Sequence, residues 1–369
     1  MASLVLTLKN EIEWNRLIAE LPVEQQDIYF TYGYYFLYEN NKEGEATCFI
    51  YKEDGNIILY PFLKNEINSL GYELDALYYD IQGAYGYNGI ISSSLDPNFI
   101  RNFQKTFSNY CKENHIVAEF TRLHPLILNK PIFEHDYKLI KDRETIVINL
   151  EDDYSAIWEK KYSSENRNMI RKAQKLGYRI KIITNPTESD ISSFIEIYIN
   201  NMQKVNADKY YYFNQNYFEN TFRKLSNSAY IFNVLNEKNE TISSSIFFTY
   251  GQYFHYHLSG KSNLSDNSAT NFLIDQAVIY AKGIGAKLFL LGGGRTSLDN
   301  DSLLKFKKNF TKDTVPFYIA KRIHNQTIYD ELLSQWEKLL SESNKSSNIL
   351  LKYRKVDYQN KQTLKNSNH

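Results

Sequence analysis

The chain has 369 residues, and its 43 lysines and arginines balance its 43 aspartates and glutamates. This length allows two domains with separate cores, and the balanced charge excludes a general attraction to nucleic acid or anionic membrane. Two cysteines, Cys48 and Cys111, predict neither a disulfide framework nor a zinc site. The sequence shows no signal-peptide pattern and no membrane-spanning stretch, so we expect a cytoplasmic protein for which peripheral membrane contact stays open.

The first half, residues 1–150, is expected to form one domain. An aromatic run at 27–38 is expected to pack against its core, and Asp54-Gly55 is a hairpin signal between two β-rich runs. Phe99, Phe103 and Phe107 form the apolar stripe of an amphipathic helix. The expected elements are a helix at 10–21, strands at 46–51 and 56–63, a helix at 97–114, and strands at 115–121 and 144–150.

The second half, residues 151–345, has a similar order of elements, which predicts a duplicated domain although no residue-level repeat is visible. Residues 346–369 are expected to form a polar, flexible tail. The fold class is therefore α/β or α+β, with mixed central sheets flanked by helices. The expected elements are helices at 152–158, 160–177, 187–205, 217–225, 271–282 and 328–340, and strands at 178–183, 229–235, 241–250, 253–258, 287–291 and 317–323.

The stretch at 253–310 carries the strongest indication of a ligand site. It reads as a strand, a polar loop, a helix and a short apolar strand that ends in three glycines, followed by a lysine-rich segment. Glycines after a buried strand allow a close approach of the backbone to a ligand, but they also form ordinary tight turns. His255 and His257 can likewise be ordinary strand residues. Neither GxxxxGK[ST] nor GxGxxG is present, so nucleotide hydrolysis and hydride transfer have little support.

A second indication comes from the basic segment at 160–175. Arg167 and Arg171 are four residues apart, so they project from the same face of a helix and could grip a phosphate or carboxylate together. A solvated basic face is the alternative interpretation.

Several of these segments, in this order, resemble the FemAB-like acyltransferases, a branch of the GNAT superfamily. They are SSENRNMIRKAQKLG, ISSSIFF, YHLSG, LLGGG and SLLKFKKNF. In the first half, YYDIQGAYGYNG and EFTRLHPL resemble GNAT-family N-acetyltransferases. The resemblance covers about residues 27–323 and implies two tandem GNAT-like acyltransferase domains.

The resemblance also implies roles for single residues. Arg167 corresponds to an arginine associated with the phosphates of a nucleotide-linked glycan acceptor, and Lys307 to a lysine near the acyl carbonyl, where a cation stabilises oxyanion charge. The coiled-coil insertion of some peptidoglycan-bridge enzymes has no counterpart. The acetyl-CoA loop pattern [RQ]xxGx[GA] is missing between Ser259 and Asn271, so the donor stays open between acyl-CoA and aminoacyl-tRNA, with no tightly bound cofactor expected.

Acyl transfer to an amine needs a base, an oxyanion stabiliser and positioning contacts. The candidate catalytic residues are Lys307, Asp80 and His257, with His255 as a further possible base. The candidate substrate-binding residues are Arg167, Arg171, Tyr85, Tyr87, Arg122, His124, His255, Tyr256 and Lys305. The candidate donor-binding residues are Gly292, Gly293, Gly294, Ser259 and Asn271. No metal site is expected, since the two histidines of the pair lack an obvious third ligand.

Three functions follow as hypotheses. The first is transfer of an acetyl or similar group from acyl-CoA to an amine of an amino sugar or another cell-envelope glycan precursor. The second is a FemX-type aminoacyltransferase that uses aminoacyl-tRNA to extend a peptidoglycan-precursor peptide. The third is a non-catalytic glycan-binding protein, for which the 31 tyrosines are the main argument. The expected partners are a nucleotide-linked or lipid-linked glycan acceptor and, in the second case, tRNA.

Overall fold

The computed structural model describes residues 2–127, 129–298, 300–339 and 351–354, and divides the chain into two compact units. Unit 1 consists of Met1–Leu17, Lys42–Lys141 and Tyr318–His369, and unit 2 consists of Ile18–Asn41 and Asp142–Phe317. The change of unit at 141 and 142 lies near the expected boundary at 150, but 18–41 and the residues from 318 group with the opposite unit. The expected tail at 346–369 lies outside the described residues, apart from 351–354.

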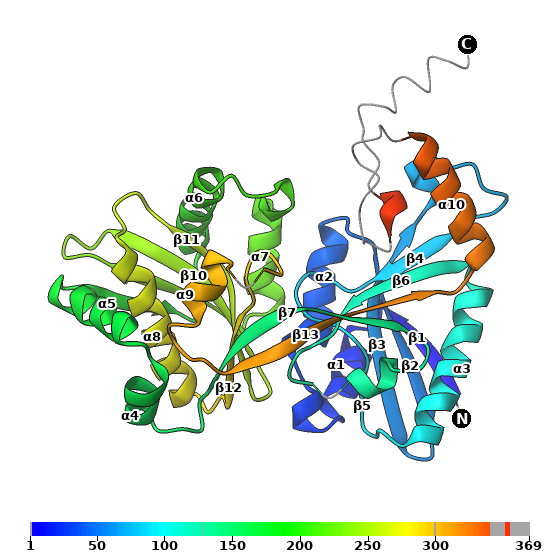
Figure 1. Cartoon of the computed structure of the whole chain (residues 1–369), viewed down its shortest axis with the longest axis horizontal. Coiled ribbons are helices and arrows are strands. Elements are labelled where there is room, and N and C mark those ends of the chain that lie inside the picture. Colours follow the sequence, from blue (N-terminus) through cyan, green and yellow to red (C-terminus); the bar gives the residue numbers. More distant parts are fainter. Residues whose placement is uncertain (1, 128, 299, 340–350, 355–369) are drawn as a thin grey trace, which may run out of the picture. The chain divides into compact units, whose positions relative to one another are not determined.

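Unit 1 is a mixed sheet with helices packed on it (Figure 1). Its strand order is β1-β2-β3-β4-β6-β13, with the part of β13 from Tyr318 onwards, and of these strands β4 and β6 run parallel. Asp54 and Gly55 adopt φ values of 48° and 78° in the turn between β2 and β3, which confirms the expected hairpin. The strands are β1 (Ala2–Thr7), β2 (Glu45–Glu53), β3 (Asn56–Glu66), β4 (Tyr79–Gln82), β5 (Ile91–Ser92), β6 (Ile116–Arg122) and β13 (Thr314–Ile323), and the helices are α1 (Glu11–Ala19), α3 (Pro97–Glu113) and α10 (Gln326–Leu339).

Two clusters form the core of unit 1. The stripe of α3 packs its phenylalanines against aromatic residues of β2 and β3, and Phe103 and Phe107 are fully buried. In a separate cluster, Leu332 and Trp336 of α10 pack with Tyr353, which belongs to the described C-terminal residues 351–354. These residues are therefore part of the core rather than of a tail.

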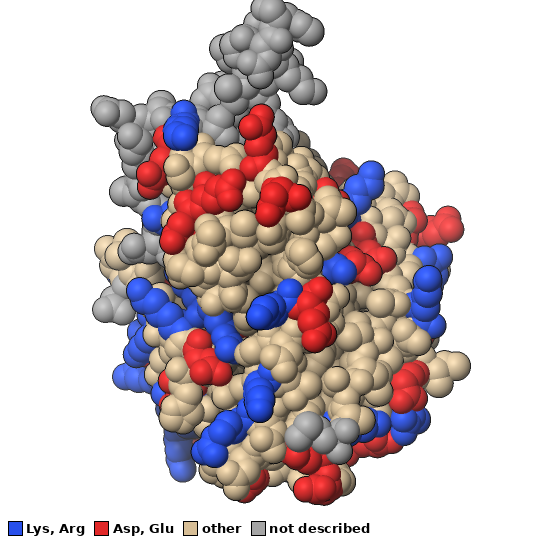
Figure 2. Space-filling model, turned by 90° about the vertical axis from the view of Figure 1, so that its right-hand side faces the viewer, with Lys and Arg blue, Asp and Glu red and all other residues tan. Residues whose placement is uncertain are grey.

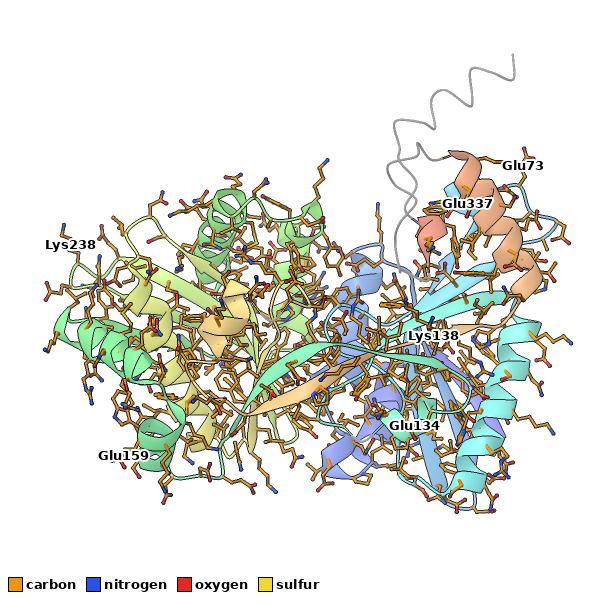
Figure 3. All side chains as sticks on the ribbon, in the orientation of Figure 1. Glu73, Glu134, Lys138, Glu159, Lys238 and Glu337 are labelled. Carbon is orange, nitrogen blue, oxygen red and sulfur yellow. The ribbon has the colours of Figure 1, made fainter. Side chains whose placement is uncertain are left out.

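Unit 2 is also a mixed sheet with helices packed on it, in the order β7-β12-β11-β10-β9-β8, and only β11 and β12 are parallel (Figure 1). Exposed turns lie at its rim, such as the β9–β10 turn with Lys238 (Figure 3). The strands are β7 (Lys138–Asn149), β8 (Arg179–Ile183), β9 (Ala229–Leu235), β10 (Thr241–Tyr250), β11 (Tyr253–Lys261) and β12 (Leu288–Gly292), and the helices are α2 (Tyr32–Asn40), α4 (Tyr154–Ala156), α5 (Ser164–Lys175), α6 (Glu188–Lys204), α7 (Gln215–Lys224), α8 (Asn267–Gly283) and α9 (Ser302–Lys307).

The aromatic run at 27–38 belongs to unit 2, which corrects the expectation that it packs against the first core. Its rings find aromatic partners there: Tyr34 packs against Phe248 of β10, and Tyr38 packs against Tyr217 of α7. Aromatic burial of this kind outweighs the closeness in sequence to the first half.

The two units repeat one arrangement, as the order of elements along the chain predicts. Each has an antiparallel strand pair, a helix and a further strand parallel to the second of the pair, namely β3-β4-α3-β6 and β10-β11-α8-β12. The expectation of tandem domains with mixed sheets flanked by helices is confirmed. Among the described residues, no helix combines the length and the apolar character that crossing a membrane requires.

Candidate functional site

The parallel strands β11 and β12 separate after a short pairing. Their register covers only Tyr253 with Leu288, Phe254 with Phe289, and His255 with Leu290, whereas β11 stays paired with β10 as far as Lys261. A bulge on each strand turns the two apart, at 256–258 of β11 and at 290–292 of β12. Within the described residues, no strand pairs with the outer part of β11 on this side. Such an edge offers backbone N–H and C=O groups to an extended ligand.

The separation of β11 from β12 beyond His255 and Leu290 leaves an opening between the two strands, and Lys307 lies beside it. Its side chain is buried, at 6% exposure, and its Nζ donates a hydrogen bond of 2.8 Å to the carbonyl of Gly293. The ammonium group lies 6.0 Å from the ring centre of Tyr256, on the outer part of β11. Burial lowers the pKa of Lys307 to about 7, against a smaller raising effect of Asp301 and a further lowering by Arg143. This lysine therefore changes its charge near neutral pH.

The segment from Gly292 onwards is held by these same charged groups. Asp301 caps α9 and accepts hydrogen bonds from the backbone of Leu304 and Thr296, both at 2.9 Å. Burial raises the pKa of Asp301, but these hydrogen bonds outweigh it and lower the value to about 2. Arg143 of β7 donates to the carbonyl of Gly294 at 2.9 Å. The expected glycine loop is thus fixed by an arginine, a lysine and an aspartate.

Two of the three glycines have no room for a side chain. A Cβ at Gly294 would lie 2.5 Å from Oδ1 of Asp301, and one at Gly293 would lie 2.9 Å from Cδ of Arg143 and 3.0 Å from the carbonyl of Glu144. Gly292 has a φ of 77°, which favours glycine. Ser259, another expected donor contact, lies on the outer part of β11 and accepts a hydrogen bond of 2.9 Å from the hydroxyl of Ser245.

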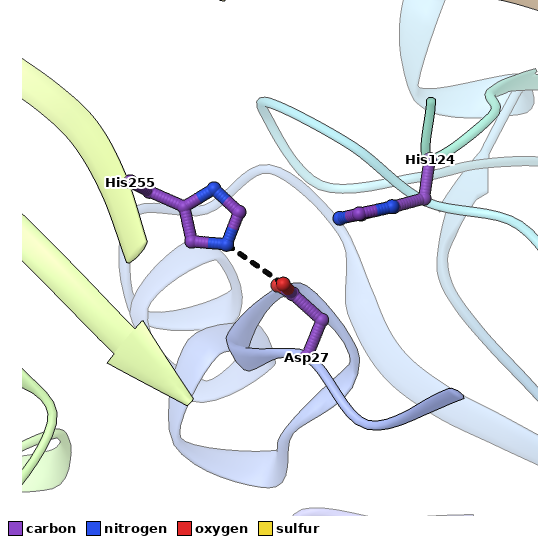
Figure 4. A group of neighbouring side chains, drawn as sticks. All are labelled: Asp27, His124 and His255. Atoms are coloured by element: carbon purple, nitrogen blue, oxygen red, sulfur yellow. Dashed lines mark hydrogen bonds and ion pairs between the residues drawn. The ribbon is translucent and has the colours of Figure 1, made fainter. Parts of the chain in front are cut away.

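His255 projects from the opposite face of β11 and pairs with Asp27 (Figure 4). Nε2 of His255 lies 2.7 Å from Oδ2 of Asp27, and both side chains are buried. The other carboxylate oxygen of Asp27 accepts from the backbone N–H of Tyr29 at 3.1 Å, so this aspartate also caps the short 3₁₀ helix Ile28–Phe30. One oxygen of Asp27 is thus fixed by the backbone of Tyr29, and the other holds the imidazole of His255 in one orientation.

His257 is bonded to a chain of tyrosines. Its Nε2 lies 3.1 Å from the hydroxyl of Tyr217, which lies 3.2 Å from that of Tyr38, which in turn lies 3.1 Å from that of Tyr34. Burial, with a smaller effect of the neighbouring His255, lowers the pKa of His257 to about 3. His257 is therefore a neutral imidazole at physiological pH and a weak base.

The two arginines expected to act together meet at Trp158. Arg167 donates to the carbonyls of Tyr162 at 2.6 Å and Trp158 at 3.2 Å, and Arg171 lies over the indole ring at 5.5 Å. Trp158 belongs to a π-helical turn, Ile157–Lys161, from which Glu159 projects outwards (Figure 3). Lys305 is exposed on α9. The shared position of the arginines is as expected, but their hydrogen bonds and ring contact give both a role within unit 2.

The start of α8 is occupied by an acidic side chain. Asp266 caps this helix by accepting from the backbone N–H of Ser268 at 3.0 Å, and it forms an ion pair of 2.8 Å with Lys172 of α5. Asn271, expected to contact the donor, is buried and donates to Asn166 of α5 at 2.7 Å, which ties the two helices together. The donor contact expected of Asn271 stays a prediction.

The remaining candidates belong to unit 1. Asp80 is fully buried on β4 and paired with Arg354, whose Nε lies 2.6 Å from Oδ2 of Asp80. Burial raises the pKa of Asp80, and Arg354 opposes this effect. Asp80 thus holds Arg354 in place, and the role as a base expected of Asp80 stays a prediction. Tyr85 follows β4 and is partly exposed.

The other three candidates of unit 1 lie around one turn. Nδ1 of His124 accepts from the backbone of Leu126 and Ile127, both at 3.2 Å, so the imidazole caps this turn. Tyr87 packs edge-on against His124, and Arg122 lies over the ring of Phe120 at 5.0 Å. On the face shown in Figure 2, basic and acidic side chains both occur and no single sign covers the surface, as the balanced net charge leads us to expect.

Sequence reasoning did not identify Asp27, Arg143 or Asp301. Asp301 could have been found, because an aspartate just before a helical segment is a capping signal. Asp27 stands before an aromatic run in the same way, but nothing in the sequence indicates its pairing with a histidine 228 residues away. Arg143 carries no local signal, since its role follows from the strand order.

No protein-family model matches the chain, and no curated protein matches its sequence. Among solved structures, FemX matches with a TM-score of 0.65 and 14% identity over 89% of this chain and 99% of that one. The C-terminal domain of a putative lysylphosphatidylglycerol synthetase from Agrobacterium fabrum matches with a TM-score of 0.55 and 12% identity, over 92% and 99%. A conserved protein of unknown function from Bacteroides thetaiotaomicron matches with a TM-score of 0.54 and 11% identity, over 86% and 98%. The chain thus has the FemAB-like acyltransferase fold that the resemblance implies.

Proposed function

We propose that this protein transfers an acyl group from an activated ester or thioester to an amine, at the opening between β11 and β12. The observation that carries the proposal is Lys307, a buried cation beside the unpaired edge of β11 whose pKa is lowered to about 7. Burying an ammonium group is costly, and the hydrogen bond from Lys307 to the Gly293 carbonyl offsets only part of that cost. A group that stabilises charge developing on a carbonyl oxygen benefits from a site that excludes water.

In this mechanism the donor lies along the outer part of β11, with its acyl carbonyl near Lys307. Attack by the amine makes a tetrahedral centre with negative charge on the former carbonyl oxygen. The ammonium group of Lys307 donates one hydrogen bond to the carbonyl of Gly293, and its other N–H groups can donate to that oxygen. Asp301 and Arg143, which hold the glycine segment, also set the charge of Lys307 through their opposing effects on its pKa.

The N-terminus of α8 bears on the choice between acyl-CoA and aminoacyl-tRNA as the donor. A helix N-terminus that follows a strand opening is a natural site for a pyrophosphate, because its N–H groups point outwards and its dipole favours negative charge. Here the carboxylate of Asp266 accepts a hydrogen bond from the backbone N–H of Ser268 and places a negative charge at the helix start. We therefore favour an aminoacyl ester, as on aminoacyl-tRNA, over acyl-CoA as the donor. The FemX-type alternative thus takes precedence over the acyl-CoA hypothesis.

For the acceptor, the resemblance to FemAB-like enzymes supports an amine of a cell-envelope precursor, either on an amino sugar or on a precursor peptide. A neighbour in fold is a putative lysylphosphatidylglycerol synthetase by its title, so a lipid-linked amine or hydroxyl is a further class to include in a screen. A non-catalytic glycan-binding protein remains the third candidate, but 16 of the 31 tyrosines that supported it are buried among the described residues of the two units.

A binding comparison tests the choice of donor. We expect purified protein to retain charged tRNA on a filter at low salt and to release it steeply as salt rises, because phosphate contacts depend on counterion release. Acetyl-CoA should cause no thermal shift, whereas a ligand at about 100 times its Kd would add roughly 2.7 kcal/mol. The variant Asp266→Asn, which keeps a capping side chain but removes the charge, should gain affinity for CoA. A clear CoA shift of the unaltered protein without tRNA retention would reverse the choice.

A further inference from the structure

The two histidines of β11 differ in what holds them. His255 is paired at 2.7 Å with the carboxylate of Asp27, whereas Nε2 of His257 lies 3.1 Å from the hydroxyl of Tyr217, and its ring packs against Phe248. An imidazole that accepts a proton becomes a cation, which a neighbouring carboxylate stabilises and a phenol hydroxyl does not. The lowered pKa of His257 agrees with this difference. His255, which the sequence places among the substrate contacts, is therefore the histidine of this strand that the structure shows paired with a carboxylate.

The position of His255 on the strand adds a second argument. It is the last residue of β11 that pairs with β12, so it marks the closed end of the opening. Phe254 and Tyr256 lie with the core cluster under α8, and Lys307 lies on that side of the strand. Because neighbouring residues of a strand alternate between faces, His255 lies on the opposite side, with Asp27. A group in the opening would have Lys307 on one face of the sheet and the histidine on the other.

The partner of His255 comes from a distant part of the sequence. Asp27 lies in 18–41, which joins unit 2 although it is separated from the remainder of that unit by a hundred residues. The aspartate is fixed by its second role, since its Oδ1 caps Ile28–Phe30 through Tyr29. The ring of Tyr29 packs edge-on against that of His255 at 4.9 Å, and Tyr253 lies at 6.3 Å. The imidazole of His255 is thus packed against two tyrosine rings and paired with the carboxylate of Asp27.

We propose that Asp27 and His255 form the proton-transferring dyad of the acyl transfer, an inference that rests on the proposed function. As the amine attacks, its N–H bond breaks and an N–H bond forms at Nδ1 of His255, while Nε2 keeps its proton towards Asp27. When the tetrahedral centre collapses, the same proton passes from Nδ1 to the leaving oxygen or sulfur of the donor. The proton lost by the amine is the one gained by the leaving group, and the dyad returns to its starting state. His255 is the catalytic residue and Asp27 the positioning residue.

The test measures kcat and KM for Asp27→Asn, His255→Gln and the double variant. The probes are total tRNA charged with radiolabelled amino acids as donor, and glucosamine or a lysine-containing UDP-muramoyl pentapeptide as acceptor. Asparagine still caps the 3₁₀ helix, so the first variant should fold. Asp96→Asn, which makes the same change at the cap of α3, is the matched control. Imidazole NMR provides a readout besides turnover: the strongly downfield Nε2 proton expected of His255 should be lost in Asp27→Asn and kept in Asp96→Asn.

We expect Asp27→Asn to lower kcat by about 10²-fold or more with KM within a few-fold, as loss of a working base does. The double variant should be no slower than His255→Gln alone, because the two residues act as one unit. Transfer by Asp27→Asn at an unaltered rate would overturn the dyad while leaving the proposed function intact. Absence of transfer by the unaltered protein with every probe would instead overturn the proposed function, and the dyad with it.

Discussion

Lys307 is the residue on which the proposed chemistry depends, and its environment explains why it is poised to change charge. Burial removes the water that would stabilise the ammonium group, and the Gly293 carbonyl returns only part of that stabilisation. Asp301 favours the charged form and Arg143 opposes it. The charge of this lysine is therefore the sum of three local effects that can be changed one at a time.

The pH dependence of transfer should follow this lysine. If protonated Lys307 stabilises the oxyanion, kcat/KM should fall as pH rises through about 7, since the lowered pKa of Lys307 removes its charge above that value. Asp301→Asn should move the fall to lower pH, because it removes the group that raises the pKa, and Arg143→Gln should move it to higher pH. The opposite result is a kcat/KM that rises with pH through about 7 in the unaltered protein and in both variants. It would show that Lys307 acts as a base.

At this scale the sequence located some residues and missed others for a physical reason. Lys307 and the glycines could be found because they follow one another in a short stretch with an unusual composition. Asp27 and Arg143 could not, since their partners are brought to them by the packing of 18–41 on unit 2 and by the pairing of β7 with β12. Local patterns carry no information about such distant pairs.

Among the elements, the separation of β11 from β12 forms the opening in which we place the candidate site. Parallel strands β11 and β12 share only three residue pairs, and the bulges that part them are not visible in the sequence, because a bulge changes no residue type. The helices were easier to place, since α3, α6 and α7 follow helical spacing and capping signals closely. The segment at 27–38 was assigned to the wrong core, as its aromatic residues suit either unit.

Residues 351–354 are few, but we expect them to contribute strongly to the stability of unit 1. Arg354 pairs with the buried Asp80 and also donates to the carbonyl of Asn65 at 3.2 Å. Arg354→Met leaves Asp80 buried without a cation and should cost about 3–5 kcal/mol in the free energy of unfolding. The loss should shrink at low pH, where the raised pKa of Asp80 lets the carboxyl take a proton.

Urea unfolding measures this effect. Asp80→Asn added to Arg354→Met should recover part of the loss, because no charge then stays buried. Arg16→Met removes an exposed ion pair with Glu13 and should change stability by less than about 1 kcal/mol. Equal, small effects of Arg354→Met and Arg16→Met would show that residues 351–354 do not anchor β4.

For the whole molecule, the duplicated order of elements was the most predictable feature. Each half of the sequence alternates hydrophobic patterns of strand and helix in the same succession, and β3-β4-α3-β6 and β10-β11-α8-β12 realise it. The units nevertheless exchange parts, since 18–41 and the residues from 318 each fold with the other half. Sequence order alone does not reveal such an exchange. A longer connection adds little loop-closure entropy, so a segment can pack with the unit in which it buries more apolar surface.

The central claim is that Lys307 drives acyl transfer to an amine. The most direct measurement is the single-turnover rate of transfer from charged tRNA, with acetyl-CoA in parallel, for the unaltered protein, Lys307→Met and Lys308→Met. Lys308 is an exposed lysine next in the chain and serves as the matched control. We predict that Lys307→Met slows transfer by about 10²- to 10³-fold, the usual loss for one oxyanion donor, while Lys308→Met keeps the full rate. Equal rates for all three proteins would contradict the proposed mechanism.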